Sequence, residues 1–226
     1  MKFSIHDLLL LTVIAALPVC GCQHRPPADE AVGQSKSTNL RSDHSKMSDE
    51  DWLKEHRQID ADLWVYREHN KLKQGDRGEW TSPPSKEEEA FENLWYFYSA
   101  ALMNNADVSS YVPFMIEHRD SLQAVGASGC LAALDQLLPL YTEQQKLTSQ
   151  REQDEFWRSK QDECDEAHAL AEDANTFGRL LLAYAERNSA KFGGVRPSRE
   201  SRARYEKAIQ SAIESLGIQL PPEKRP

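Results

Sequence analysis

The chain has 226 residues, of which 39% are hydrophobic and 28% are charged. This length suits one domain with additional segments. The formal net charge of −9 argues against nonspecific binding of the whole chain to nucleic acid, because phosphates attract basic surfaces. The charge is uneven: residues 85–192 hold 19 acidic and 9 basic residues, whereas residues 193–226 hold 4 acidic and 7 basic residues. An acidic body therefore carries a basic tail.

The N-terminal residues have the pattern of an export signal. The apolar run Leu8–Val19 is short for a membrane-spanning helix, which needs roughly 20 apolar residues, but it suits a signal-peptide core. The residues that follow resemble a bacterial lipobox, in which a small residue precedes a cysteine that is lipidated. Cys22, after Gly21, fits this pattern better than Cys20 does. We predict a signal peptide with a lipobox over 1–22 and lipidation of Cys22.

This signal predicts where the protein is located. A lipid on Cys22 would anchor the protein to the membrane in the cell envelope, on the periplasmic side. An uncleaved signal anchor is the first alternative, and a cytoplasmic location is the second. Residues 23–48 are rich in Ser, Pro, Gly, Asp and Lys and have almost no large apolar residues. We predict that they form a disordered linker between the membrane and the folded domain.

The body of the chain begins with a long amphipathic pattern. Ser48 precedes three acidic residues, which is typical of a helix start. Trp52, Ile59 and Tyr66 then recur every seven residues, so we predict a helix over 49–73. Residues 74–85 contain two glycines and two adjacent prolines and are predicted to form a loop.

An aromatic-rich segment over 87–104 is the predicted centre of the fold. Ser85 and Glu88 form a capping-box pattern at its start. The turn formers of residues 104–107 follow its end. Large apolar residues share one face of this helix: Phe91, Leu94, Trp95, Tyr98 and Leu102.

Shorter helices are predicted next. One covers 108–118, with Pro113 in its first turn or kinking it, and another covers 120–125, closed by Gly126. A stronger apolar pattern predicts a helix over 128–138 that ends before a proline.

Two more helices complete the predicted body. Residues 148–172 are acidic with few apolar residues, so we expect a single helix on the surface. Residues 173–188 have a strong apolar stripe and predict a core helix, after which Phe192 packs back onto the core. No segment alternates as a strand does. The predicted class is therefore all-α, with a compact multi-helix bundle over 49–195.

Residues 196–226 are predicted to form a basic C-terminal helix and tail, with an amphipathic helix over 198–216. Its N-terminal half contains three arginines, where the helix dipole disfavours cations. We expect these arginines to dock towards the acidic residues of 152–173. The three are Arg199, Arg202 and Arg204.

A family resemblance lies in pattern and spacing over residues 91–192. Its parts are the aromatic helix, the turn at 104–107, a Val125-Gly126-Ala127 step, an Ala/Leu helix, and Tyr184, Asn188 and Phe192. In these features the chain resembles a bacterial domain-of-unknown-function family that includes an acidic DNA-mimic protein. The resemblance implies an all-helical fold and an acidic surface that imitates DNA phosphates. The turn departs from the family, because Ala106 and Asp107 stand where Gly and Phe are expected.

An acidic run is the candidate partner-binding surface. Such a surface can attract and steer a basic protein partner. The plainer interpretation is a solvated helix face. The run comprises Glu152, Asp154, Glu155, Asp162, Glu163, Asp165, Glu166, Glu172 and Asp173.

Two cysteines, Cys130 and Cys164, lie outside the predicted signal peptide. Outside the cytoplasm they can form a disulfide; the alternative is one buried and one exposed thiol. Cys164 and His168 are four residues apart and could form half of a metal site, but no second pair has matching spacing. We therefore predict no metal and no cofactor.

The sequence contains no nucleotide-binding loop, zinc-protease motif or nucleophile elbow. The predicted function is a membrane-tethered, non-catalytic interaction module that binds an unidentified, basic protein and not nucleic acid directly. The first alternative is an acidic DNA mimic that sequesters a DNA-binding protein. The second is an envelope hydrolase.

Overall fold

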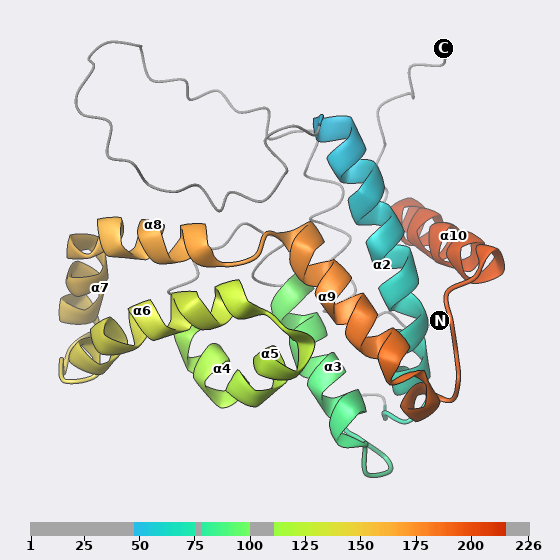
Figure 1. The fold of residues 1–226 in the computed structure, drawn as a ribbon, viewed down its shortest axis with the longest axis horizontal. Helices are drawn as coiled ribbons and strands as arrows, with labels where there is room; N and C mark the ends of the chain where they lie inside the picture. Colours follow the sequence, from blue (N-terminus) through green and yellow to red (C-terminus); the bar gives the residue numbers. More distant parts are fainter. Residues whose placement is uncertain (1–47, 76–77, 100–110, 216–226) are drawn as a thin grey trace.

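The structure is a computed structural model that describes residues 48–75, 78–99 and 111–215 (Figure 1). Over these residues the fold is all-α, as predicted, and the one pairing of extended backbone is an isolated bridge between Gln74 and Trp80 in the predicted loop. The predicted signal peptide with Cys22, nearly all of the linker, and the turn at 104–107 lie outside the described residues.

Three helices from opposite ends of the chain pack side by side. Helix α2 (Asp49–Lys71) lies between α9 (Ala174–Arg187) and α10 (Arg199–Ser215), as Figure 1 shows. The predicted start of α2 is confirmed, because the Ser48 side chain accepts a hydrogen bond from the Asp51 backbone N–H. The predicted stripe of α2 is buried at Ile59 and Tyr66. The first α-helix of the described residues is therefore held by the last two α-helices described.

The aromatic helix α3 (Lys86–Phe97) is central, as predicted. Both halves of the capping box between Ser85 and Glu88 are present. The backbone continues through Tyr98 and Ser99 with π-helical geometry, and the rest of the predicted 87–104 helix lies outside the described residues. Several aromatic residues of this segment are fully buried: Phe91, Phe97 and Tyr98.

A cluster of aromatic rings joins α2, α3 and the segment after α9. The short 3₁₀ helix η4 (Ser189–Phe192) places Phe192 in the core with no exposure, which confirms that this ring packs back. Its ring centroid lies 5.3 Å from that of Tyr66 and 5.4 Å from that of Phe91, both in edge-to-face geometry. Gly193 follows with a φ of 65°, and a Cβ there would meet the His69 ring at 2.9 Å.

Two short helices cover the other side of α3. Helix α4 (Val112–Glu117) has Pro113 in its first turn, where the missing N–H costs no hydrogen bond. Helix α5 (Arg119–Val125) ends at Gly126, whose φ of 84° is left-handed. Both features agree with the sequence-based prediction.

Helix α6 (Ser128–Gln144) is longer than the predicted 128–138, because it continues through Pro139. Pro139 is exposed. Proline has no backbone N–H, so the carbonyl of Asp135 lacks its usual helical hydrogen bond. Asp135 is also exposed, so this carbonyl can bond to water instead. A proline on the solvent side of a helix therefore does not end it here.

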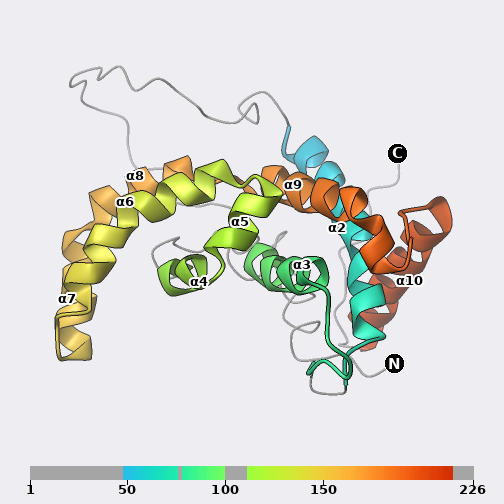
Figure 2. The same ribbon diagram turned by 60° about the horizontal axis from the view of Figure 1, so that its bottom comes forward.

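The predicted single helix over 148–172 is wrong. The chain forms α7 (Gln150–Ser159) and α8 (Gln161–Leu170), with a break at Lys160. Figures 1 and 2 show that α8 returns alongside α6 and that α7 lies at the far end of the pair. The break lets Cys164 and Ala167 bury themselves against α6, with 1% and 0% exposure, which a straight helix pointing into solvent would not allow.

The predicted docking of the α10 arginines on the acids of 152–173 is also wrong. Helix α10 packs on α2, and Arg202 donates two hydrogen bonds to Asp62, at 2.6 and 3.0 Å. The Asp62 side chain is 9% exposed. An unpaired carboxylate is more costly when it is nearly buried than when it is exposed. The Arg202 guanidinium therefore pairs with Asp62 and not with the exposed acidic run.

Candidate functional site

Helices α7 and α8 form an acidic arm, which we define as residues 150–170. Figure 2 shows α7 at the end of the molecule away from α2 and α10. No side chain of α7 is buried, and Trp157 and Phe156 are only half-buried. The arm holds seven of the nine predicted partner-binding acids. The exposed ones are Glu152, Asp154, Glu155, Asp162, Asp165 and Glu166; Glu163 is half-buried.

Most of these carboxylates make local contacts on their own helix. Glu155 pairs with Arg151 at 2.8 Å, and Glu163 pairs with Lys160 at 2.9 Å. Hydrogen bonds from the Ser149 side chain and backbone hold the pKa of Glu152 below its usual range. Exposed pairs of this kind contribute little to stability and are exchanged easily. The arm therefore leaves its carboxylates accessible to a partner.

The last two acids of the predicted run have structural contacts instead. Glu172 accepts hydrogen bonds from the backbone N–H groups of Gly129 and Cys130, at 2.6 and 2.7 Å, at the start of α6. Asp173 is the N-cap of α9 and accepts from the Thr176 N–H at 3.0 Å. Glu172 thus ties the segment after α8 to the start of α6, Asp173 caps α9, and both lie outside the acidic arm.

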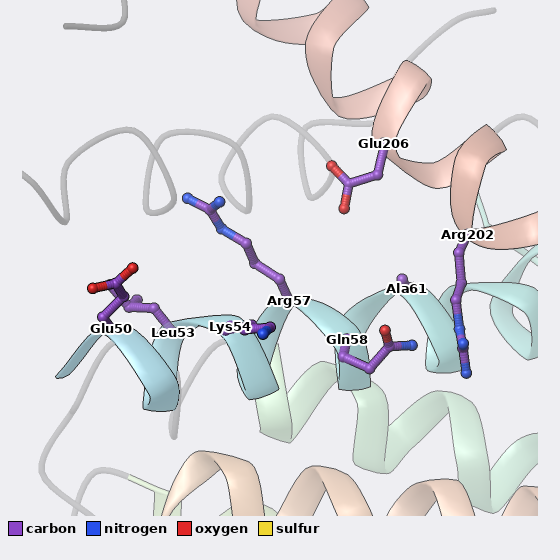
Figure 3. A pocket seen from close by; sticks show the side chains of 8 residues that line it. All are labelled: Glu50, Leu53, Lys54, Arg57, Gln58, Ala61, Arg202 and Glu206. Carbon is purple, nitrogen blue, oxygen red and sulfur yellow. The ribbon is translucent and has the colours of Figure 1, made fainter. Parts of the chain in front are cut away.

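A groove runs between α2 and α10 and contains two adjoining cavities. The larger, of about 440 Å³, is drawn in Figure 3, where Arg57 of α2 and Glu206 of α10 extend into the space between the helices. The smaller has a volume of about 370 Å³ and is called the Tyr66 cavity here. Arg202 lines both cavities, and its guanidinium is bonded to Asp62.

The Tyr66 cavity contains a tyrosine with an unsatisfied hydroxyl. Tyr66 is fully buried, and its hydroxyl has no hydrogen-bond partner in the part of the chain that the structure describes. Burial raises its pKa to about 12, a shift that Glu186 increases and Arg196 opposes. The remaining wall consists of Asp62, Pro197 and Arg202. The groups that surround this hydroxyl are thus charged but do not bond to it.

A second polar network lies deep between α2, α3 and α9. Tyr98 donates a hydrogen bond to Asp60 at 2.6 Å, and His56 lies 3.6 Å from the other Asp60 oxygen. The other His56 nitrogen lies 2.5 Å from the Asn175 amide oxygen. Burial raises the pKa of Asp60, against the lowering effects of His56 and the Tyr98 hydrogen bond. All four residues are at most 4% exposed, and none lines either cavity, so the network holds helices together.

Cys130 and Cys164 are both buried and do not form a disulfide with each other, so neither the predicted disulfide nor the alternative of one buried and one exposed thiol describes the structure. Burial, with Glu172 nearby, raises the pKa of the Cys130 thiol well above its usual range. Among the described residues there is no group of three or more His, Cys, Asp or Glu that could hold a metal ion. His168 is half-buried, and its Nδ1 has no hydrogen-bond partner.

Sequence reasoning missed the Tyr66 cavity. Tyr66 belongs to the apolar stripe of α2, so its pattern predicts a core residue and nothing more. Arg196 and Glu186 follow no motif, and only the fold brings them beside Tyr66. The Pro197 that follows Arg196 signals a loop but not a binding site.

Among the described residues, no helix combines the length and the apolar composition needed to cross a bilayer. Comparisons of the chain with family models, with curated proteins and with solved structures found no match. The resemblance to the DNA-mimic family therefore stays a prediction.

Proposed function

We propose that the protein is a non-catalytic interaction module that is tethered to the membrane in the cell envelope and binds a basic protein through its acidic arm. The observation that carries the proposal is that α7 buries none of its side chains. A helix of this length is only marginally stable in water without packing against other elements. The exposed side chains of α7 therefore contribute little to the stability of the domain. What α7 and α8 offer instead is a surface of accessible carboxylates beside half-exposed aromatic rings.

The composition of the arm suits a protein partner. Carboxylates attract a basic surface over roughly one Debye length, about 8 Å at physiological salt, and speed the encounter. Half-exposed Phe156 and Trp157 lie next to each other, with ring centroids 5.6 Å apart, and can supply the apolar anchor that interfaces favour. This combination favours a protein over a small ion as the ligand.

Neutralising the arm should abolish partner binding. The variant replaces Asp154, Glu155, Asp162, Asp165 and Glu166 by the corresponding amides, and it leaves the capping residue Glu152 intact. We expect the partner recovered by crosslinking in cells to fall at least about tenfold, because several steering charges are lost together. The measurement is quantitative mass spectrometry of the crosslinked material.

A matched control carries the same change of charge elsewhere. Five other exposed acids, Glu117, Asp120, Glu143, Glu200 and Glu214, are replaced by amides, and partner recovery should stay at the wild-type level. If partner recovery falls equally in both variants, or falls in neither of them, the partner does not bind through the arm. A DNA-binding protein that DNA displaces from the arm would favour the DNA-mimic alternative.

The tether is tested separately at Cys22. We expect metabolic lipid labelling of the wild type to be lost in Cys22→Ser, while the wild type fractionates with the envelope. Cys20→Ser is the control and should keep its label. Unlabelled wild-type protein in the cytoplasm would refute the proposed location.

A further inference from the structure

The Tyr66 cavity has features of a binding site for a small molecule, and this inference is independent of the proposed function of the acidic arm. The cavity volume of about 370 Å³ lies near the lower end of the range of ligand pockets, roughly 300–1,000 Å³. Its walls come from α2, from the end of α9 and from the segment that leads to α10. It is therefore formed only when the ends of the domain come together.

The Tyr66 hydroxyl is the first observation that points to a ligand. A buried tyrosine hydroxyl almost always has a hydrogen-bond partner, and Tyr98 in the same core donates to Asp60 at 2.6 Å. The Tyr66 hydroxyl has none. Tyr66 lines the cavity, so a ligand there whose acceptor atom reaches the hydroxyl would satisfy it.

The charges around the hydroxyl select the class of ligand. Asp62 already neutralises Arg202 through two hydrogen bonds. Arg196 and Glu186 are exposed, and within the described residues neither makes an ion pair or a side-chain hydrogen bond. Both act on the Tyr66 hydroxyl, Glu186 by raising its pKa and Arg196 by lowering it. One cation and one anion that are not paired with each other thus line the same cavity as this donor.

We propose that the Tyr66 cavity binds a small zwitterion of the amino-acid class. The carboxylate of the ligand lies between the Arg196 guanidinium and the Tyr66 hydroxyl, which donate hydrogen bonds to it. The ammonium group of the ligand faces Glu186. A doubly charged phosphate is disfavoured, because the free charges of the cavity sum to zero and Glu186 would repel the second negative charge.

Binding is tested by calorimetric titration of the full chain in mild detergent. The probes are glycine, L-alanine, L-serine and L-glutamate, with acetate, methylammonium and inorganic phosphate as ligands that each lack one half of the zwitterion. We expect at least one amino acid to bind with a Kd of about 1 mM or tighter. Acetate, methylammonium and phosphate should each bind at least about tenfold more weakly than that amino acid, because each lacks one of the two charged groups that the cavity would bond.

Variants assign the two ends of the ligand. Arg196→Gln should weaken amino-acid binding at least about tenfold, and Tyr66→Phe about three- to tenfold. Glu186→Gln should weaken amino acids but not acetate. Arg199→Gln is the control, because Arg199 is exposed and lies outside both cavities. No binding by any amino acid, tighter binding of acetate or phosphate, or binding unchanged in Tyr66→Phe and Arg196→Gln would overturn the proposal.

The stability of the ligand-free protein gives a second readout. Tyr66→Phe removes only a hydroxyl without a partner, so its melting temperature should equal or exceed that of the wild type. Tyr98→Phe removes a hydroxyl bonded to buried Asp60 and should lower it. Equal losses in the two variants would show that the Tyr66 hydroxyl is already satisfied, and the argument for a ligand would fail.

Discussion

Replacement of Phe192 by alanine is expected to lower the free energy of unfolding by about 3–5 kcal/mol. The ring has no exposure and contacts Tyr66 of α2 and Phe91 of α3. Its removal leaves a cavity where three separate segments meet, and the rigid aromatic neighbours cannot fill it completely. The measurement is urea unfolding followed by circular dichroism. Such a loss is a large fraction of the roughly 5–15 kcal/mol that stabilises a typical domain.

Two further variants make the Phe192 prediction specific. Phe192→Leu leaves a smaller cavity and should cost about 1–2 kcal/mol, which keeps the experiment readable if the alanine variant is unfolded. Phe156→Ala removes a half-exposed ring from the acidic arm and should cost less than about 1 kcal/mol. Similar losses for Phe156→Ala and Phe192→Ala would contradict a core centred on the aromatic cluster.

Glu88→Gln is expected to destabilise the protein by about 2–3 kcal/mol at neutral pH. The Glu88 side chain is 2% exposed and accepts hydrogen bonds from the Ser85 backbone N–H at 2.8 Å and from Lys73. His69 lies 3.2 Å from the same oxygen that Lys73 contacts. An amide keeps the shape of the side chain but leaves Lys73 without its counter-charge.

The same carboxylate should make stability depend on pH. Burial raises the pKa of Glu88, but the hydrogen bonds from Lys73 and Ser85 outweigh it, so the net pKa is lower than its ordinary 4.5. The folded state then binds fewer protons than the unfolded state, and this contribution is complete above the unfolded pKa. Stability should fall as the pH drops below about 5 towards the folded pKa, and this part of the fall should be absent in Glu88→Gln.

Glu89→Gln is the control for both effects of Glu88. Glu89 lies in the same first turn of α3, carries the same charge and is exposed. It should change the unfolding free energy by about 0.5 kcal/mol or less and leave the pH profile unaltered. If stability falls at low pH by the same amount in the wild type and in Glu88→Gln, the lowered pKa of Glu88 is not the cause of that fall.

The sequence predicted those helix ends and buried faces that depend on residues only a few positions apart. Ser85 and Glu88 satisfy each other within one turn, so their pairing can be read from four consecutive residues. Gly126 ends α5 because its left-handed φ of 84° suits glycine. The stripe of α9 is confirmed at Phe177 and Leu181, which are buried because helical spacing places both on the core side.

The errors came from contacts that no local pattern contains. Nothing between residues 148 and 172 breaks a helix by itself, and the break at Lys160 exists because α8 gains burial against α6. Arg202 lies 140 residues from Asp62, so its partner could not be chosen from the sequence. The acidic run of 152–173 is nearer to Arg202 in sequence and carries more negative charge than Asp62. Arg202 pairs with Asp62 because leaving a nearly buried carboxylate unpaired costs more than leaving exposed ones unpaired.

The placement of α2 between α9 and α10 has a consequence for the order of folding. Helix α2 packs against residues that are synthesised much later, since Asn175, 123 positions further on, bonds the Trp52 carbonyl and Arg202, 140 positions further on, bonds Asp62. Contacts this distant in sequence make folding slow and late. The side chains of α2 that face α9 and α10 therefore stay uncovered on a nascent chain until both of these helices have been synthesised.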